Sequence, residues 1–273
     1  MPELVEVQTI ADHLRGVILG RRIRDIRVHT PLVVVGRPTA LRKGLRGAVV
    51  QEVTRRGKFL VLHLAQAQTL VIDLRMTGQL RWYPPAEPLD SHTHVSVDWT
   101  DLPEQLRYRD VRKFGRFRLL PTASLAEVPP LARLGPDALH LSLKAFEGRL
   151  GERRRSIKAA LLDQSVLAGL GNIYTDEALF RAQIHPERPV TSLSPAERRA
   201  LHRAIQEVLR EGIRLGGSSI DTYLHPDGGK GRFQTRHRVF QRRGLPCVRC
   251  GTPIVRVVVG SRGTHLCPEC QHM

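Results

Sequence analysis

Two periods of hydrophobic positions run through the first half of the chain. Val7, Ile10 and Leu14 recur at the spacing of one helix face, which predicts a short helix that ends near Gly20. From about residue 23 to residue 120 the period becomes two, and glycine and proline separate the short alternating runs. Such runs are typical of the strands of a β-sandwich or a β-barrel.

Helical patterns follow a proline-rich linker in the second half of the chain. The linker is predicted between Pro121 and Pro136. Ser194 and Glu197 have the spacing of a capping box, and a proline stands between them at the first helical position. That helix is expected to stop at Gly216 and the glycine that follows it.

The whole pattern predicts an α+β protein with three parts. We expect an N-terminal β-sandwich domain with flanking helices over residues 1–132. A helical domain over residues 133–244 includes a glycine- and arginine-rich stretch, residues 217–244, which is predicted to be a mobile loop. A small module over residues 245–273 closes the chain.

The charge balance indicates a polyanionic partner. The 273 residues include 43 Lys and Arg against 26 Asp and Glu, a formal charge of +17. A field of this kind attracts nucleic acid, although a protein from a basic proteome would also show it. Hydrophobic residues make up 41%, enough for folded cores, whereas the 5% of aromatic residues argues against rows of stacked single-stranded bases.

Membrane and secretion signals are not found in the sequence. No hydrophobic run approaches the ~20 residues of a bilayer-spanning helix. The start is acidic and lacks the apolar core of a signal peptide. We therefore expect a cytoplasmic protein with no membrane partner, in a compartment that keeps thiols reduced.

Four cysteines near the C-terminus have the spacing of a zinc ribbon. Cys247 and Cys250 form one CxxC pair, and Cys267 and Cys270 form the second, sixteen residues later. Four thiolates complete a tetrahedral shell and leave no position for water. The sequence therefore predicts one structural Zn²⁺ rather than a catalytic metal.

The N-terminus offers a second kind of chemistry. Removal of Met1 would leave Pro2 with a secondary amine, which can attack a sugar carbon and form a cationic iminium. An α-amino group titrates near ~7.7–8, so a useful fraction is neutral at pH 7. Glu3 is placed to act as an acid or base beside it. By position alone, Pro2 equally suits Met1 removal and Glu3 equally suits the opening of a helix.

Other candidates have polar or wedge-like side chains that suit DNA. Asn172 is expected to cap a helix behind two glycines, and Lys158 lies at the start of another helix, so both positions suit a phosphate or a plain helix cap. Arg262 is predicted at a hairpin tip, where it either clamps a phosphate or is solvated. Met76 and Phe114 suit either a protein core or a wedge that enters the base stack.

These motifs together resemble those of bacterial formamidopyrimidine-DNA glycosylases, within a wider group that includes the endonuclease VIII-like enzymes. The resemblance runs over essentially the whole chain. It rests on these segments, in this order: Pro2-Glu3-Leu4, Arg56-Gly57-Lys58, Arg75-Met76-Thr77-Gly78, Asp110-x-Arg112-Lys113-Phe114-Gly115, Gly171-Asn172-Ile173-Tyr174 and the four-cysteine finger.

The resemblance implies a two-domain clamp with DNA in its cleft. Its parts would be a β-sandwich with flanking helices, a helix–two-turns–helix domain and a zinc finger. The loop near residues 217–238 matches the one that closes over a flipped oxidised purine. Residue by residue, the implied roles are Pro2 as nucleophile, Glu3 as acid/base, Lys58 as the hairpin lysine beside the lesion, Met76, Arg112 and Phe114 as the triad that fills the vacated gap, and His92, Lys158, Asn172 and Arg262 as phosphate contacts.

The chain departs from the family pattern at several positions. These departures bear on lesion preference and affinity more than on the chemistry, because they spare the implied catalytic residues. They are Val5 in place of a proline, Gln8 in place of a glutamate, Asp73 where histidine is common, Asp221 where lysine or arginine is frequent, and Gln241 in place of a glycine.

The resulting hypothesis is a bifunctional DNA glycosylase and abasic-site lyase. Its expected partner is double-stranded DNA that contains an oxidised purine or an abasic site, and a monomer in the bacterial cytoplasm, at the nucleoid, would suffice. Two alternatives remain at this point. One is a lesion-binding clamp that excises nothing, and the other is the same chemistry directed at oxidised pyrimidines.

Overall fold

The computed structural model describes residues 1–273 and separates them into two compact units. The first unit comprises residues 1–132 together with residues 216–232. The second comprises residues 133–215 together with residues 233–273. The mixed α+β class predicted from the sequence is confirmed, with β-sheets in the N-terminal part and helices and a finger in the C-terminal part.

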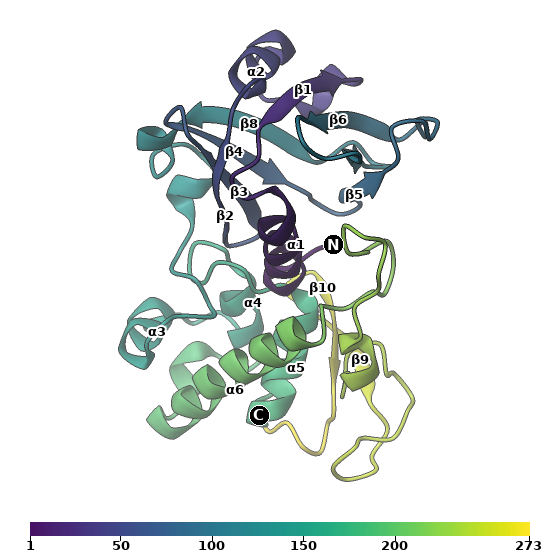
Figure 1. Cartoon of the computed structure of the whole chain (residues 1–273). Helices are drawn as coiled ribbons and strands as arrows, with labels where there is room; N and C mark the ends of the chain where they lie inside the picture. The colour runs from purple at the N-terminus through teal and green to yellow at the C-terminus, as the bar shows by residue number, and fades with distance from the viewer. The chain divides into compact units, whose positions relative to one another are not determined.

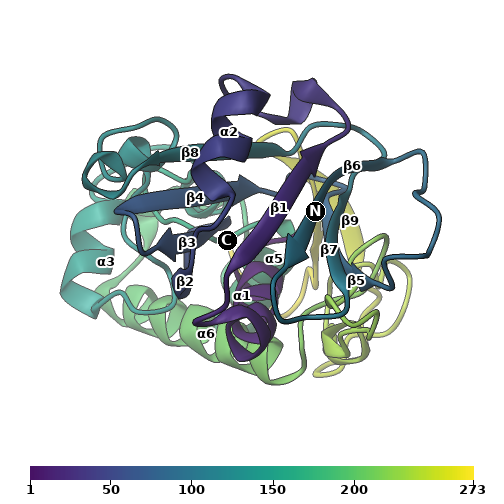
Figure 2. The ribbon, with the colours of Figure 1, turned by 45° about the horizontal axis from the view of Figure 1, so that its top comes forward.

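Two antiparallel four-stranded sheets form the first unit (Figures 1 and 2). Their strand orders are β1-β6-β7-β5 and β2-β3-β4-β8. The elements of this unit are α1 (Leu4–Ile18), β1 (Ile23–Val28), α2 (Pro38–Leu45), β2 (Val50–Arg56), β3 (Phe59–Leu64), β4 (Gln68–Asp73), β5 (Gln79–Tyr83), β6 (Thr93–Trp99), β7 (Gln105–Arg109) and β8 (Arg116–Pro121).

The core of the first unit follows the predicted periods. Helix α1 buries Val7, Ile10 and Leu14 on one face, and it packs against β2 and β3. Trp99 and Tyr108 are large buried side chains of this core. Because α1 is held by this apolar face, the residues at its N-terminus have a defined position.

Helix α2 lies within residues 23–120, the stretch in which the pattern predicted strands. Its start is set by Pro38 at a first-turn position, and Leu41 and Leu45 bury one face four residues apart. A Cβ at Gly44 would lie 2.3 Å from the side chain of Leu119, so this close packing suits glycine. The prediction was wrong here because an eight-residue helix is too short for a clear period.

Residues 216–232 pack into the first unit. The backbone N–H of Trp82 donates to the carbonyl of Pro226 at 2.9 Å, and Tyr223 belongs to the hydrophobic core. Gly216 and Gly217 have φ angles of 71° and 81°, a region that glycine enters without strain. The three-part division of the chain and the mobility of this loop stay predictions, to which the structure adds these contacts.

The second unit is helical and ends in a two-stranded hairpin (Figure 1). Helices α5 and α6 pack side by side. The predicted capping box of α6 is present, with Ser194 and Glu197 satisfying each other's backbone N–H groups. The elements are α3 (Leu143–Leu150), α4 (Ile157–Leu162), α5 (Asn172–Ala182), α6 (Pro195–Arg214), β9 (Val255–Val259) and β10 (Arg262–Leu266). None of the helices has the length and hydropathy of a transmembrane span.

Candidate functional site

The N-terminal residues lie at the positive end of helix α1. Pro2 is buried, and Glu3, which is only 3% exposed, is the residue that caps the helix. The Glu3 side chain accepts from the backbone N–H of Glu6, while Glu6 Oε2 accepts from the N–H of Glu3 at 2.8 Å. This reciprocal pair fixes the backbone on which Pro2 stands, and the helix dipole favours the carboxylates there.

The second oxygen of Glu6 connects helix α1 to residues 216–232. Glu6 Oε1 accepts from the backbone N–H of Ser218 at 2.9 Å. At Gly217 a Cβ would lie 3.0 Å from the same oxygen, so the loop approaches the carboxylate closely. Glu6 therefore joins the N-terminus to the predicted lesion loop, a role that its position in a helical pattern did not reveal.

Lys58 lies in the tight turn between β2 and β3, at the hairpin position that the family resemblance implies. Gly57 has a φ of 58°, which the turn requires, and Lys58 is half-buried. The guanidinium of Arg55 donates to the Gly57 carbonyl at 3.2 Å and to Gln8 Oε1 at 2.9 Å. Through Arg55, Gln8 thus connects the turn of Lys58 to helix α1, whose N-terminus follows Pro2.

The three residues of the predicted wedge lie together at the surface. Met76 is 42% exposed and Phe114 is 47% exposed. Arg112 Nη1 lies 2.9 Å from Met76 Sδ, and its guanidinium carbon lies 4.5 Å from the centroid of the Phe114 ring. The structure therefore brings together two apolar side chains and one cation from two separate segments.

A buried aspartate holds the two wedge segments together. Asp110 accepts from Thr77 Oγ1 at 2.5 Å, from Tyr108 Oη at 2.9 Å and from the backbone N–H of Gly115 at 2.9 Å. It also accepts from the N–H of Arg112 at 3.2 Å. Burial opposes the charge, but these hydrogen bonds outweigh it and lower the pKa of Asp110.

The residues that depart from the family pattern lie in different surroundings. Asp73 pairs with Arg75 at 2.6 Å, and burial raises the pKa of Asp73 against the pull of that arginine. Val5 is completely buried in helix α1, whereas Asp221 is exposed. Gln241 has a φ of 57°, in the left-handed region that favours glycine.

The backbone of His92 is hydrogen-bonded to the wedge segment that begins at Asp110. Its carbonyl accepts from the N–H of Asp110 at 3.0 Å, and its N–H donates to Asp90 Oδ1 at 2.8 Å. The side chain is partly exposed. His92, Met76, Arg112 and Phe114 therefore belong to one region of the first unit, and their DNA contacts stay predictions.

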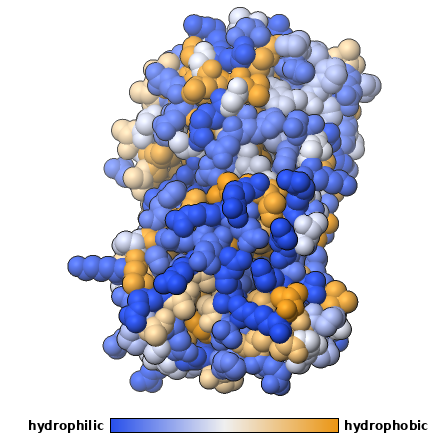
Figure 3. Space-filling view, turned by 60° about the horizontal axis from the view of Figure 1, so that its bottom comes forward, coloured by the Kyte–Doolittle hydropathy of each residue, from blue (hydrophilic) through white to orange (hydrophobic).

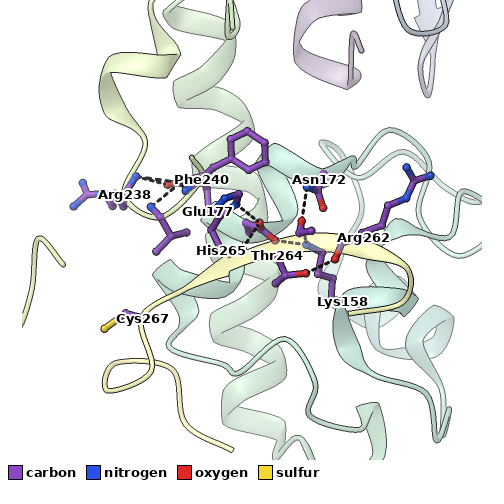
Figure 4. A network of polar contacts seen from close by, with 12 residues as sticks. Lys158, Asn172, Glu177, Arg238, Phe240, Arg262, Thr264, His265 and Cys267 are labelled. Atoms are coloured by element: carbon purple, nitrogen blue, oxygen red, sulfur yellow. Dashed lines mark hydrogen bonds and ion pairs between the residues drawn. The ribbon is translucent and has the colours of Figure 1, made fainter. Parts of the chain in front are cut away.

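The remaining predicted residues lie where the finger hairpin meets helices α4 and α5 (Figure 4). Arg262 is exposed at the start of β10, as expected. Asn172 was expected to cap α5, but Gly171 is the cap residue, and Asn172 Nδ2 instead donates to the Gly263 carbonyl at 2.8 Å. Lys158 is fully buried, so its ammonium faces the interior, and a direct phosphate contact stays a prediction.

Sequence reasoning missed Glu177 on helix α5. Its buried carboxylate accepts from the backbone N–H groups of Arg238, Val239 and Phe240 at 2.9 to 3.0 Å. Burial raises the pKa of Glu177. The only signal in the sequence was a pair of adjacent acidic residues in a helical stretch, which does not reveal long-range partners.

The four cysteines meet at one point of the second unit. Their sulfur atoms all lie within 4.8 Å of one another. Cys247 Sγ lies 3.8 Å from Cys270 Sγ, and Cys250 Sγ lies 3.5 Å from Cys267 Sγ. A tetrahedral zinc with ~2.3 Å bonds needs sulfur atoms about 3.8 Å apart. The donor set therefore fits one structural Zn²⁺, as predicted from the spacing.

The chain combines a β-sheet unit in which Pro2 is buried with a helical unit that carries a four-cysteine finger. Family models support this organisation. The formamidopyrimidine-DNA glycosylase N-terminal domain matches residues 1–117, the H2TH domain matches residues 134–223, and the zinc finger found in FPG and IleRS matches residues 244–272. The chain belongs to the formamidopyrimidine-DNA glycosylase family.

Curated relatives and solved structures are similar over their full length. The formamidopyrimidine-DNA glycosylase of Bacillus subtilis is 42% identical, covering 99% of both chains. That of Geobacillus kaustophilus is 45% identical, covering 99% of this chain and 100% of the relative. Lactococcus lactis Fpg in complex with DNA containing an abasic site is 37% identical, with a TM-score of 0.93 and coverage of 99% and 100%. A variant of the same enzyme with Fapy-dG DNA has the same identity and TM-score over the whole of both chains.

Proposed function

We propose that this protein excises oxidised purines from double-stranded DNA and then cleaves the abasic site, as a DNA-formamidopyrimidine glycosylase with lyase activity. The observation that carries the proposal is full-length identity of 42–45% to formamidopyrimidine-DNA glycosylases, combined with Pro2 and Glu3 at the capped start of α1. The relatives whose structures contain Fapy-dG or abasic DNA support the same substrate class.

Pro2 supplies the nucleophile once Met1 has been removed. Its nitrogen then attacks C1′ of the damaged nucleotide and loses its proton, the bond from C1′ to the base breaks, and the base leaves with a proton. The bond from C1′ to O4′ then opens, O4′ takes up a proton, and C1′ and the nitrogen form the cationic iminium. The resulting iminium withdraws electrons from the sugar, so the 3′-phosphate leaves by β-elimination and the 5′-phosphate by δ-elimination. Glu3, beside the nucleophile, and Lys58, in the turn joined to the same helix, transfer protons and balance charge.

Binding of the duplex rests on cations and on the exposed wedge. The formal charge of +17 favours binding to DNA of any base sequence. Hydrophilic side chains cover most of the face shown in Figure 3. Arg262, Asn172 and His92 contact phosphates in this proposal. Met76, Arg112 and Phe114 occupy the gap that a flipped nucleotide leaves. Flipping costs a few kcal/mol, least at a damaged pair, which contributes selectivity.

Zinc has a structural part in this proposal. Cys247, Cys250, Cys267 and Cys270 hold it, and the closed shell gives the finger a stable fold without a position for substrate. A monomer carries every residue named here, and action at the bacterial nucleoid follows from DNA as partner.

The test is borohydride trapping on two duplexes, one with a single 8-oxoguanine and one with an abasic site. The purified protein, with Met1 confirmed absent by mass spectrometry, is compared with Pro2→Gly. A covalent adduct on both duplexes that the substitution abolishes is the expected result. DNA binding without an adduct on either duplex would contradict the enzyme and favour a non-excising lesion clamp.

Oxidised pyrimidines are a second candidate substrate. The observation that favours them is a solved complex of Lactococcus lactis Fpg with DNA containing an oxidised pyrimidine, at 36% identity and a TM-score of 0.92. A third duplex with one oxidised pyrimidine separates the two. Faster trapping on that duplex than on 8-oxoguanine would move the main substrate to pyrimidines and leave the amine mechanism intact.

A further inference from the structure

A buried ion pair lies beneath the finger hairpin. Lys158 Nζ on α4 lies 2.5 Å from Asp176 Oδ1 on α5, and both side chains are completely buried. Lys158 Nζ also lies 3.4 Å from the carbonyl of Gly263 on β10. A fully buried ammonium has no direct access to a phosphate at the surface, so the role implied for Lys158 by family resemblance needs another explanation.

Asp176 reaches the hairpin with its second oxygen. Oδ2 accepts from the backbone N–H of His265 at 2.9 Å and lies 3.6 Å from Nδ1 of the same residue. The carboxylate therefore joins three elements: α4 through Lys158, its own helix α5, and β10 through His265.

Asn172 and Asp176 act on the same stretch of β10. They are four residues apart on α5, so they share one helix face. Asn172 binds the Gly263 carbonyl and Asp176 binds the His265 N–H, two residues further along the strand. Together they fix the register of β10 against α5. Because Arg262 directly precedes Gly263, this register also decides where Arg262 is presented.

We propose that Asp176 is a positioning residue for DNA binding. It anchors the His265 N–H, with Lys158 as its internal counter-ion, and thereby sets Asn172 and Arg262 at the spacing needed for phosphates. Lys158 acts through Asp176 and does not touch DNA. This inference rests on the proposed function, because it takes Asn172 and Arg262 as DNA contacts.

The experiment compares two double substitutions that both remove the buried charges. Removing one charge alone would leave the other buried without its opposite charge, which is costly, so a loss of folding could not be told from a loss of DNA binding. Lys158→Met with Asp176→Asn keeps an acceptor oxygen for the His265 N–H. Lys158→Met with Asp176→Leu removes it. Arg262→Gln is the control for a direct phosphate contact. All proteins carry zinc, verified by metal analysis.

The main measurement is the Kd for a duplex with a tetrahydrofuran abasic analogue across a series of salt concentrations. The variant with Lys158→Met and Asp176→Asn is called the Asn pair, and the variant with Lys158→Met and Asp176→Leu is called the Leu pair. The Asn pair is expected to bind within about threefold of the unsubstituted protein and to keep its salt slope. The Leu pair is expected to bind about tenfold more weakly. Its salt slope should fall by about one, as for Arg262→Gln, because one phosphate contact is lost. Adding Arg262→Gln to the Leu pair should then change little.

Three outcomes would overturn the proposal. A slope lowered by about one in the Asn pair would mean that Lys158 itself contacts a phosphate. Equal Kd values for the Asn and Leu pairs would mean that the anchor positions nothing. Equal hydrogen-exchange protection of the His265 amide in both pairs, measured without DNA, would mean that Asp176 is no anchor. Failure of the unsubstituted protein to prefer the damaged duplex would instead contradict the proposed function, and the exchange measurement would still test the anchor.

Discussion

Buried carboxylates hold the loops of this basic chain in place. Glu6, Asp110, Asp176 and Glu177 are all buried, and each accepts a hydrogen bond from another segment: Asp110 from the Thr77 hydroxyl and the other three from a backbone N–H. A carboxylate offers two acceptor oxygens and binds donors more strongly than a neutral group does. Single acidic residues therefore order the segments that carry the candidate DNA contacts.

Asp110→Asn is expected to destabilise the first unit. An amide nitrogen would face donors that now share one carboxylate, such as the Tyr108 hydroxyl and the Gly115 N–H. Because hydrogen bonds to charged groups contribute about 1.5–3 kcal/mol, the free energy of unfolding should fall by about 2 kcal/mol. Urea denaturation measures this loss. Asp101→Asn, at an exposed position, is the control, and equal effects of the two substitutions would contradict the central role of Asp110.

His237 predicts a pH dependence of stability. Burial lowers the pKa of His237 to about 4, from an ordinary value of 6.5. Between these values the unfolded chain binds a proton that the folded chain does not, so stability falls as the pH falls from about 6.5 to about 4. The loss is at most about 3 kcal/mol, since one pKa unit corresponds to about 1.4 kcal/mol. Denaturation at a series of pH values should show it.

The control for His237 is its replacement by phenylalanine, which has no titrating group. The ring contacts with Phe233 and Phe240 suit an aromatic side chain at this position. The substituted protein should lose less stability over the same pH interval. An unchanged pH profile would show that His237 is not the group responsible.

At the scale of elements, helix starts place the candidate residues. Helix α1 presents Pro2 and Glu3 through a capping box, and α5 presents Asn172 and Asp176 on one face. Tight turns do the same for Lys58 and Arg262. Local hydrogen bonds of these caps and turns fix the backbone from which the candidate side chains extend.

The cap of α6 can be tested in isolation from the candidate site. Ser194 Oγ accepts from the N–H of Glu197 at 3.2 Å, and Glu197 Oε2 accepts from the N–H of Ser194 at 2.8 Å. Ser194→Ala removes half of this pair and should cost about 1 kcal/mol of unfolding free energy. Hydrogen exchange in the first turn of α6 should rise with it. Ser91→Ala, at an exposed position, should change neither quantity.

At the scale of the whole molecule, zinc is expected to control DNA binding through the fold of the finger. Cys247, Cys267 and Cys270 belong to a hydrophobic cluster with Phe180 and Ile254, so release of the metal should loosen this cluster. Removal of zinc with a strong chelator should weaken binding of the abasic analogue at least tenfold, and added zinc should restore it. Unchanged binding by protein shown to be free of metal would contradict this prediction.

The candidate site was predictable wherever its signal was local. The zinc ligands follow from the spacing of two CxxC pairs, and the family resemblance, carried by Arg56-Gly57-Lys58, implies the hairpin position of Lys58. The α6 cap follows from Ser194 and Glu197 three residues apart. By contrast, the prediction that Asn172 caps α5 was wrong, because the Asn172 side chain donates to a carbonyl 91 residues away instead of capping its own helix.

The amino-acid sequence by itself determined the α+β class, the zinc ligands and the family, and it supplied the proposal for the residues that bear the chemistry. Each of these depends on residue type and on the spacing and order of residues along the chain. Only the tertiary structure decided that Asp110 joins the wedge segments, that Glu6 holds the loop at Ser218, and that Lys158 faces inwards to Asp176. The physical reason is that a buried charge must find a partner, and long-range packing, which periodicity does not encode, selects that partner.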